Sequence, residues 1–304
     1  MSSPQSDEYL RKSVQETGVH EGWVSIFQDD LLYYFNRSIA NVEGNLLNRE
    51  GMVPEKSKIL LALSRCAPED IKVVILGHEP ISNKNLATGF AFSFPEGEII
   101  DENVGQRELK PEEGFSVKML HDVLADAGYL ERGATYDCCH EVWADRGVLL
   151  LNASLTYSMG HFSLWKKFVS RLLCLLVQLN RSQRLFFLCW GTNAKEISEW
   201  LLAKLWEIGI GTQAIKHDQH NTWVENSAPV VVFVGDHPTY PRDKNEFVQQ
   251  AKIQFHAIKQ WYPDLFTLEK HIPALAPDTE RQNRTREEEE EKRSSRPEPY
   301  LSAQ

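Results

Sequence analysis

The sequence predicts an α/β protein, a three-layer α/β/α sandwich with a central four-stranded parallel sheet. The first observation is a set of apolar runs without polar alternation, as in strands that are buried on both faces. These runs cover residues 73–76, 148–151, 185–188 and 230–234. The second observation is that segments with helical periodicity separate the runs, which is typical of parallel sheets. We therefore expect one domain over residues 21–268.

The first half of the chain is expected to contain three helices. Residues 21–38 carry apolar side chains at amphipathic spacing, and residues 54–66 form a second helix. The glycines and asparagines of residues 41–53 indicate a loop between these two helices. Residues 115–130 form the next helix, and residues 135–146 a loop that leads into the second strand.

In the second half, a strongly apolar helix is expected at His161–Leu179, and further helices at residues 193–207 and 243–262. Residues 209–225 lack a clear period and are expected to form an irregular connection. The histidines in that connection, His217 and His220, receive no role because lone loop histidines are usually solvated.

Both ends of the sequence are polar, and we expect both to be disordered. Residues 1–20 precede the first helical pattern. Residues 277–304 form a charged, low-complexity tail with five consecutive glutamates. A solvated tail is the default interpretation, and recruitment of a partner or a nuclear address are the alternatives.

Composition narrows the class of protein. The chain has 304 residues, 42% hydrophobic and 25% charged, as in ordinary soluble globular proteins. No apolar run has the length of a membrane span and no signal peptide is recognisable, so no membrane association is expected. The five cysteines have no Cys-x-x-Cys spacing, which favours reduced thiols. A metal at Cys138, Cys139 and His140 is less favoured, and we expect no metal or other cofactor.

The formal net charge of −10 bears on the partners. Phosphate contacts dominate binding to nucleic acids, so an acidic composition by itself favours a protein partner. A local positive groove can nevertheless coexist with an acidic exterior, so DNA remains possible.

Polar side chains follow three of the predicted strands. Glu79 comes soon after the first strand, Asn152 ends the second, and His237 follows the last. Ligands bind at the carboxyl ends of the strands in open α/β sheets. A carboxylate, an amide and an imidazole at one edge of one sheet therefore form a candidate active site.

Five short motifs in the same order resemble those of uracil-DNA glycosylases. The family's Gly-Gln-Asp-Pro-Tyr-His is approached by GHEPIS at residues 77–82, and its Gly-Leu-Cys-Phe-Ser by GFAFS at residues 89–93. Its Leu-Leu-Leu-Asn-Ala is matched at residues 149–153. Its Leu-Trp-Gly and His-Pro-Ser are approached at residues 189–191 and 237–239. The resemblance covers about residues 23–262 and implies the family's α/β fold.

The resemblance implies a role for each matched side chain. Phe92 would stack on a uracil flipped out of the DNA, and Asn152 would pair with the edge of that base. His237 would donate a hydrogen bond to the uracil oxygen where negative charge develops. Glu79 stands for the family's aspartate and would orient water and oppose the positive charge on the sugar. His78, in the same motif, is expected to contact the substrate.

Each assignment has a structural alternative. Phe92 shares its strand parity with Phe90 and Phe94, so all three are also candidates for the core. Asn152 is also compatible with a turn after its strand. Glu79 and His237 are also compatible with solvated loops.

The family contacts DNA with a serine loop and with a leucine after its His-Pro-Ser motif. Ser116 is the candidate for the serine, with a helix N-cap as the alternative role. Thr239, Tyr240 and Arg242 replace the leucine segment and would hold the DNA by stacking or by a phosphate contact. The residues after His237 resemble the poxvirus branch, in which the protein also serves as a replication scaffold.

Two interpretations follow. The first is a hydrolase that releases uracil from DNA, a monomer that acts in the nucleus (the host nucleus for a viral protein) or the cytoplasm. The second is a catalytically decayed glycosylase fold that binds DNA or a replication protein. Glu79, one methylene longer than aspartate, and Ile81, in place of the tyrosine that bars thymine, separate this chain from the family pattern. A third interpretation, a different base specificity, would use Ile81.

Overall fold

The structure is a computed structural model that describes residues 19–27, 29–45, 52–96, 111–134, 136–157, 160–216, 228–238 and 244–268. All of these belong to the first of two compact units, Met1–Glu269. The second unit, Lys270–Gln304, lies outside the described residues. The expectations for residues 1–18, for the tail at 277–304 and for His217 and His220 therefore stay predictions. Within the described part of the chain, no helix is long and apolar enough to cross a membrane.

The centre of the fold is a five-stranded sheet in the order β2-β1-β3-β5-β4, with every neighbouring pair parallel. The strands are β1 (Val73–Gly77), β2 (Val148–Asn152), β3 (Leu185–Trp190), β4 (Thr212–Lys216) and β5 (Val230–Gly235). All residues of β1, β2 and β3 are buried, as expected for strands covered by helices on both faces. The α/β class and the four predicted strands are confirmed.

The sheet has one strand more than the sequence predicts. The additional strand is β4, inside residues 209–225, where we expected an irregular connection. It pairs only with β5 and lies at the edge of the sheet. An edge strand needs less apolar surface than a central one, and Ile215 is its only buried residue among those whose burial is described. A strand of this kind leaves no long apolar run in the sequence.

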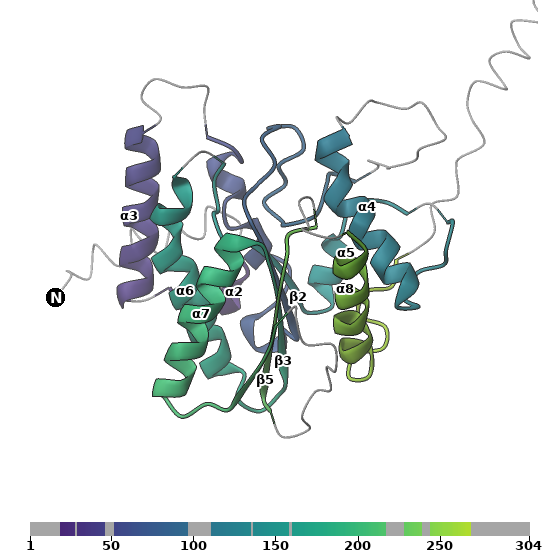
Figure 1. The fold of residues 1–304 in the computed structure, drawn as a ribbon. Helices are drawn as coiled ribbons and strands as arrows, with labels where there is room; N and C mark the ends of the chain where they lie inside the picture. The colour runs from purple at the N-terminus through teal and green to yellow at the C-terminus, as the bar shows by residue number, and fades with distance from the viewer. Residues whose placement is uncertain are drawn as a thin grey trace, which may run out of the picture. The chain divides into compact units, whose positions relative to one another are not determined.

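Helices cover both faces of the sheet, which confirms the three-layer prediction (Figure 1). One layer holds α3 (Asp29–Asn45), α6 (His161–Leu179) and α7 (Thr192–Glu207), in which α6 packs against both α3 and α7. The other holds α4 (Pro111–Asp126), α5 (Glu141–Asp145) and α8 (Lys244–Lys259), in which α4 packs on α8. The helix at His161–Leu179 has the predicted bounds.

The beginning of the fold differs from the prediction of one helix and a following loop. A short helix, α2 (Glu21–Val24), ends before α3, and α3 extends to Asn45, into the predicted loop. The break has a local cause, because Trp23 is fully buried and its indole Nε1 donates a hydrogen bond to the carbonyl of Cys66 at 2.8 Å. That contact sets the direction of α2 independently of α3, which packs on α6.

The helix predicted at residues 54–66 is wrong. The chain instead forms two 3₁₀ turns there, η1 (Lys56–Lys58) and η2 (Leu61–Leu63), and a third, η3 (Pro68–Asp70), follows before β1. These turns bury Leu60 and Leu63 without a regular helix. They also bring the Lys58 carbonyl so close to Gly89 that a Cβ at Gly89 would lie 2.1 Å from its oxygen. The loop predicted at 135–146 is likewise interrupted by the short helix α5.

The start of β2 depends on a glycine. Gly147 has φ +102°, and its carbonyl accepts hydrogen bonds from the amides of Lys72 and Val73 at the start of β1. A Cβ at this position would lie 2.4 Å from the carbonyl oxygen of Asp70. Only glycine adopts this conformation at so close an approach without strain, so Gly147 fixes how the first two strands come together.

We expect Gly147→Ala to lower the free energy of unfolding by more than about 1 kcal/mol, because alanine fits neither the backbone conformation nor the space. Gly44→Ala is the matched control, since Gly44 is helical and nothing lies within 4 Å of a Cβ there. Urea titration of both variants measures the difference. Equal stabilities would show that Gly147 imposes no such constraint.

Candidate active site

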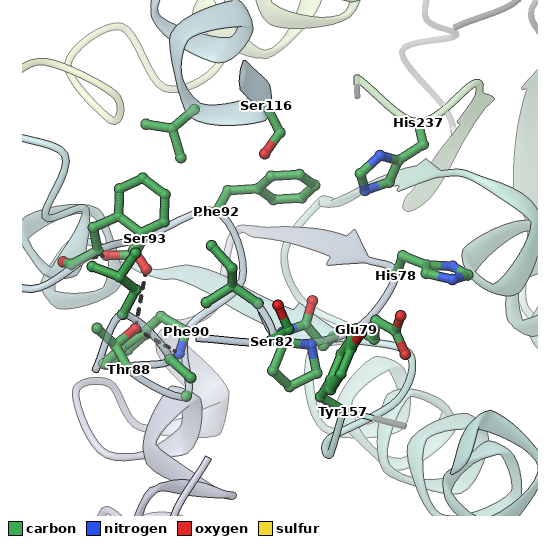
Figure 2. Close-up of a pocket in the computed structure, with 18 residues that line it drawn as sticks. His78, Glu79, Ser82, Thr88, Phe90, Phe92, Ser93, Ser116, Tyr157 and His237 are labelled. Carbon is green, nitrogen blue, oxygen red and sulfur yellow. Dashed lines mark hydrogen bonds between the residues drawn. The ribbon is translucent and has the colours of Figure 1, made fainter. Parts of the chain in front are cut away.

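A cavity of about 370 Å³ opens at the carboxyl edge of the sheet (Figure 2). Six of the nine predicted site residues line it: His78, Glu79, Phe92, Ser116, Asn152 and His237. The other three, Thr239, Tyr240 and Arg242, lie outside the described residues. The structure therefore brings together all of the predicted site residues that it describes.

The ends of β1 and β2 form the floor of this cavity. Gly77 is in register with Asn152, and the Gly77 carbonyl accepts the amide of Ala153 at 2.9 Å. The His78 carbonyl accepts the amide of Ser154 at 3.0 Å. These backbone bonds fix the position of Asn152, which is 6% exposed, relative to the loop that carries His78 and Glu79.

Gly77 lets two functional side chains approach the end of β1. A Cβ at Gly77 would lie 2.6 Å from Oδ1 of Asn152 and 3.2 Å from Cε2 of Phe92. The first distance is shorter than any ordinary contact. The absence of a side chain at Gly77 therefore permits the present positions of the Asn152 amide and the Phe92 ring.

Phe92 lies in the segment between β1 and α4. Two backbone hydrogen bonds hold its neighbours, from the amide of Ala91 to the carbonyl of Leu150 and from the amide of Phe94 to the carbonyl of Cys138, both at 3.0 Å. The Phe92 ring contacts Trp190 at a centroid distance of 5.7 Å. It lies 5.8 Å from the ring of His237 at an interplanar angle of 32°.

The structure separates Phe92 from the two phenylalanines beside it, which the sequence pattern does not. Phe90 and Phe94 are both 4% exposed, whereas Phe92 is only partly buried. Figure 2 shows the Phe92 ring directed across the cavity toward His237. Phe92 therefore offers an aromatic face to a ligand, as stacking on a planar base requires.

His237 follows β5 and packs against the end of β3. Gly191, which has φ +93°, leaves the space for it, because a Cβ there would lie 3.1 Å from Cβ of His237. Burial, with a smaller contribution from the nearby His78, lowers the pKa of His237 to about 4. The two rings are 6.1 Å apart. At neutral pH His237 is therefore a neutral imidazole that can donate one hydrogen bond.

Glu79 is half-buried in the same loop as His78, and it lines the cavity together with Tyr157 and Ser82 (Figure 2). Burial raises the pKa of the Glu79 carboxyl above its ordinary value. Burial likewise lowers the pKa of His78. Glu79 is therefore a carboxylate in a partly desolvated place, where its charge acts more strongly than in water.

Ser116 is not the N-cap of its helix, because α4 begins at Pro111. It lies inside the first turns of α4, and its hydroxyl points toward the Phe92 ring in Figure 2. The N-cap alternative is wrong, since the helix starts at Pro111 rather than at the predicted residue 115. A DNA contact stays a prediction.

Ile81 joins an apolar wall beside the cavity. Its side chain packs against a buried cluster made of Leu86, Phe94, Val117 and Cys138. It also lines the cavity itself. The position that carries a tyrosine in the family pattern is therefore filled by an aliphatic side chain anchored in the protein.

Sequence reasoning missed Tyr157 and the role of Trp190. Tyr157 lines the cavity and is 42% exposed, and it follows Asn152 by five residues in the segment after β2. Trp190 supports the Phe92 ring, and its own Nε1 donates to Oε1 of Gln254 on α8 at 3.0 Å. The position of Trp190 at the end of a predicted strand could have marked it as a site residue. Nothing in the local sequence marks Tyr157 as one.

The cavity thus combines an aromatic face, an amide, a neutral imidazole and a carboxylate. Of the proteins with similar sequences, the uracil-DNA glycosylase of Haemophilus influenzae strain PittEE is 32% identical over 171 residues, which are 54% of this chain and 69% of that protein. The chain belongs to the uracil-DNA glycosylase family. The gallid herpesvirus 2 uracil-DNA glycosylase is also 32% identical, over 183 residues, 58% of this chain. This chain spans about half of that viral enzyme, 53% of its length.

Solved uracil-DNA glycosylases share the fold of this family member. The mimivirus enzyme has a TM-score of 0.53 at 18% identity, with 78% of this chain and 75% of that chain covered. The enzyme from Nitratifractor salsuginis has a TM-score of 0.55 at 17% identity, with 88% and 100% covered. No family model matches the sequence. The likeness to the poxvirus branch stays a prediction.

The variant Gly77→Ala tests the close approach at the end of β1. The new methyl group would displace the Asn152 amide and the Phe92 ring, so we expect affinity for free uracil to fall at least about tenfold, the loss of a single well-placed contact. Isothermal titration calorimetry measures the affinity of wild type and variant for uracil. Gly44→Ala again serves as the control for the added methyl group, and an unchanged uracil affinity in Gly77→Ala would contradict this account of the floor.

Proposed function

We propose that the protein cleaves the N-glycosidic bond between uracil and deoxyribose in DNA. The observation that carries the proposal is the convergence of Phe92, Asn152, His237 and Glu79 on one cavity. Three different strands and one long connection supply these four side chains. Membership of the uracil-DNA glycosylase family supports the same conclusion.

Recognition of the base requires that it leaves the DNA stack. The flipped uracil stacks on Phe92, whose ring is held by Trp190. The Asn152 amide offers one donor and one acceptor, which matches the edge of uracil with its alternating N–H and carbonyl groups. Because Asn152 is 6% exposed and fixed to the end of β1, it pairs without having to be ordered first.

Bond cleavage places negative charge on the departing uracil and positive charge on the sugar. His237, neutral at neutral pH, donates a hydrogen bond to the uracil oxygen that becomes negative. Glu79 opposes the positive charge on the sugar and orients the attacking water. Glu79 lies in the half-buried loop after β1, and its side chain is one methylene longer than the family's aspartate.

The remaining parts of the proposal concern the setting of the reaction. We assign DNA contacts to Ser116 at the cavity and to Thr239, Tyr240 and Arg242 outside the described residues. A monomer working in the nucleus or the cytoplasm is consistent with a reaction that needs one cavity. The acidic net charge of −10 supports a replication protein as an additional partner.

His237→Ala removes the proposed donor to the leaving group. We expect the single-turnover rate of uracil release to fall by about 10²–10³, as for loss of one oxyanion donor. The melting temperature should change little, because His237 lies in a loop. The control is His256→Ala, which removes an exposed histidine of α8. A rate unchanged from wild type would remove His237 from the mechanism.

Glu79→Gln keeps the shape of the side chain and removes its charge. We expect a strongly reduced rate, whereas Glu79→Asp restores the carboxylate of the family pattern and retains activity. Release of uracil from a labelled oligonucleotide, followed by alkaline cleavage, measures all three proteins. Complete inactivity of wild type and both variants, with intact DNA binding, would instead indicate a decayed glycosylase fold.

The pH dependence of the rate follows from the raised pKa of Glu79. The carboxylate must be ionised, so activity is present at neutral pH and is lost as the pH falls through this raised pKa, above the ordinary value of 4.5. His237 causes no loss of activity above neutral pH, because its pKa is lowered to about 4 and it is already neutral there. The residual activity of Glu79→Gln should not fall with pH in this way. A fall of that activity over the same pH range would assign the titration to a group other than Glu79.

A further inference from the structure

The base-stacking residue has a strained backbone. Phe92 has φ +55°, and among the described residues it is the only one other than glycine with a positive φ. Side chains other than glycine are disfavoured in this region, and such a conformation persists only where surrounding contacts impose it. In addition to the contacts from the strands, His140 contacts the Phe92 backbone from outside the strand ends.

His140 contacts the Phe92–Ser93 segment through both its side chain and its backbone. Its Nδ1 lies 2.6 Å from the carbonyl oxygen of Phe92, and its backbone N–H donates to Oγ of Ser93 at 2.9 Å. The ring is fully buried and stacks on Trp143 at a centroid distance of 3.8 Å and an angle of 8°. Because a carbonyl oxygen only accepts, Nδ1 of His140 carries the proton.

His121 fixes this tautomer from helix α4. Its Nε2 lies 2.8 Å from Nε2 of His140, so the two nitrogens share one proton. A neutral His140 that is protonated at Nδ1 has a bare Nε2, and His121 therefore donates from its own Nε2. Burial lowers the pKa of His121 to about 4 and that of His140 well below its ordinary value. Both rings are neutral at neutral pH.

We propose that His121 and His140 are positioning residues that hold Phe92 in its strained conformation. His121 donates a hydrogen bond from its Nε2–H to Nε2 of His140, and His140 donates from its Nδ1–H to the carbonyl oxygen of Phe92. This inference rests on the proposed function, because it gives the two histidines a part in stacking the uracil. Neither histidine lines the cavity.

The tautomers are the most direct test, and they need no enzymatic activity. Nitrogen NMR of protein labelled in its histidine rings should show His140 protonated at Nδ1 and His121 protonated at Nε2 at pH 7. A proton on Nε2 of His140 would overturn the proposal, because Nδ1 then has no hydrogen to donate to Phe92.

Two substitutions of His121 test its effect on Phe92. His121→Phe keeps an aromatic ring but removes the donor, so His140 is free to take its proton at Nε2. His121→Gln keeps a donor, and its side-chain amide can satisfy His140 Nε2. We expect uracil release to fall about tenfold or more in His121→Phe, as for a misplacement well under 1 Å, and to recover at least in part in His121→Gln.

The control for lost stability is Val123→Ala, a fully buried position two residues along α4. It should lower the melting temperature without changing uracil release. Crystal structures of the His121 variants give the φ of Phe92, which should leave the positive region in His121→Phe and stay there in His121→Gln. An unchanged φ in His121→Phe would overturn the proposal. If the wild-type protein releases no uracil, the proposed function fails. The histidine tautomers and the φ of Phe92 still test whether His121 and His140 position Phe92.

Discussion

The in-register pairing of β1 with β2 is the constraint on which the site depends. It places Gly77 beside Asn152 and leaves 2.6 Å between the missing Cβ of Gly77 and the amide oxygen of Asn152. The Phe92 ring uses the same space. A shift of one residue in this register would bring a side chain into the space and would turn Asn152 to the other face of the sheet. All residues of both strands are buried, which disfavours such a shift.

The chemistry of the cavity follows from partial desolvation of its polar groups. The same burial raises the pKa of Glu79 and lowers that of His237. A carboxylate that is less stabilised by water is better able to stabilise a nearby cation, and a neutral imidazole donates to a developing anion without needing a proton from solution. One physical cause, the depth of the strand-end cavity, thereby prepares two groups for opposite charges.

A rigid arrangement behind the cavity complements the rigid floor. Phe92 lies between Trp190, which α8 holds through Gln254, and the backbone contact to His140. The loop that carries Phe92 is therefore fixed by elements from both halves of the chain. Pre-ordered aromatic and amide groups lose little conformational freedom on binding a base, which favours recognition.

The sequence by itself determined four of the five strands, the long apolar helix His161–Leu179 and the residues at the strand ends, because buried strands and amphipathic helices leave strong local patterns. The edge strand β4 and the turns at residues 56–63 left no such pattern, since their conformation depends on their neighbours. The same holds for the site. Motifs and strand ends marked Glu79, Asn152 and His237, whereas the separation of Phe92 from Phe90 and Phe94 required the tertiary structure. Only the folded chain brings His140 to the Phe92 carbonyl, a contact between residues 48 positions apart.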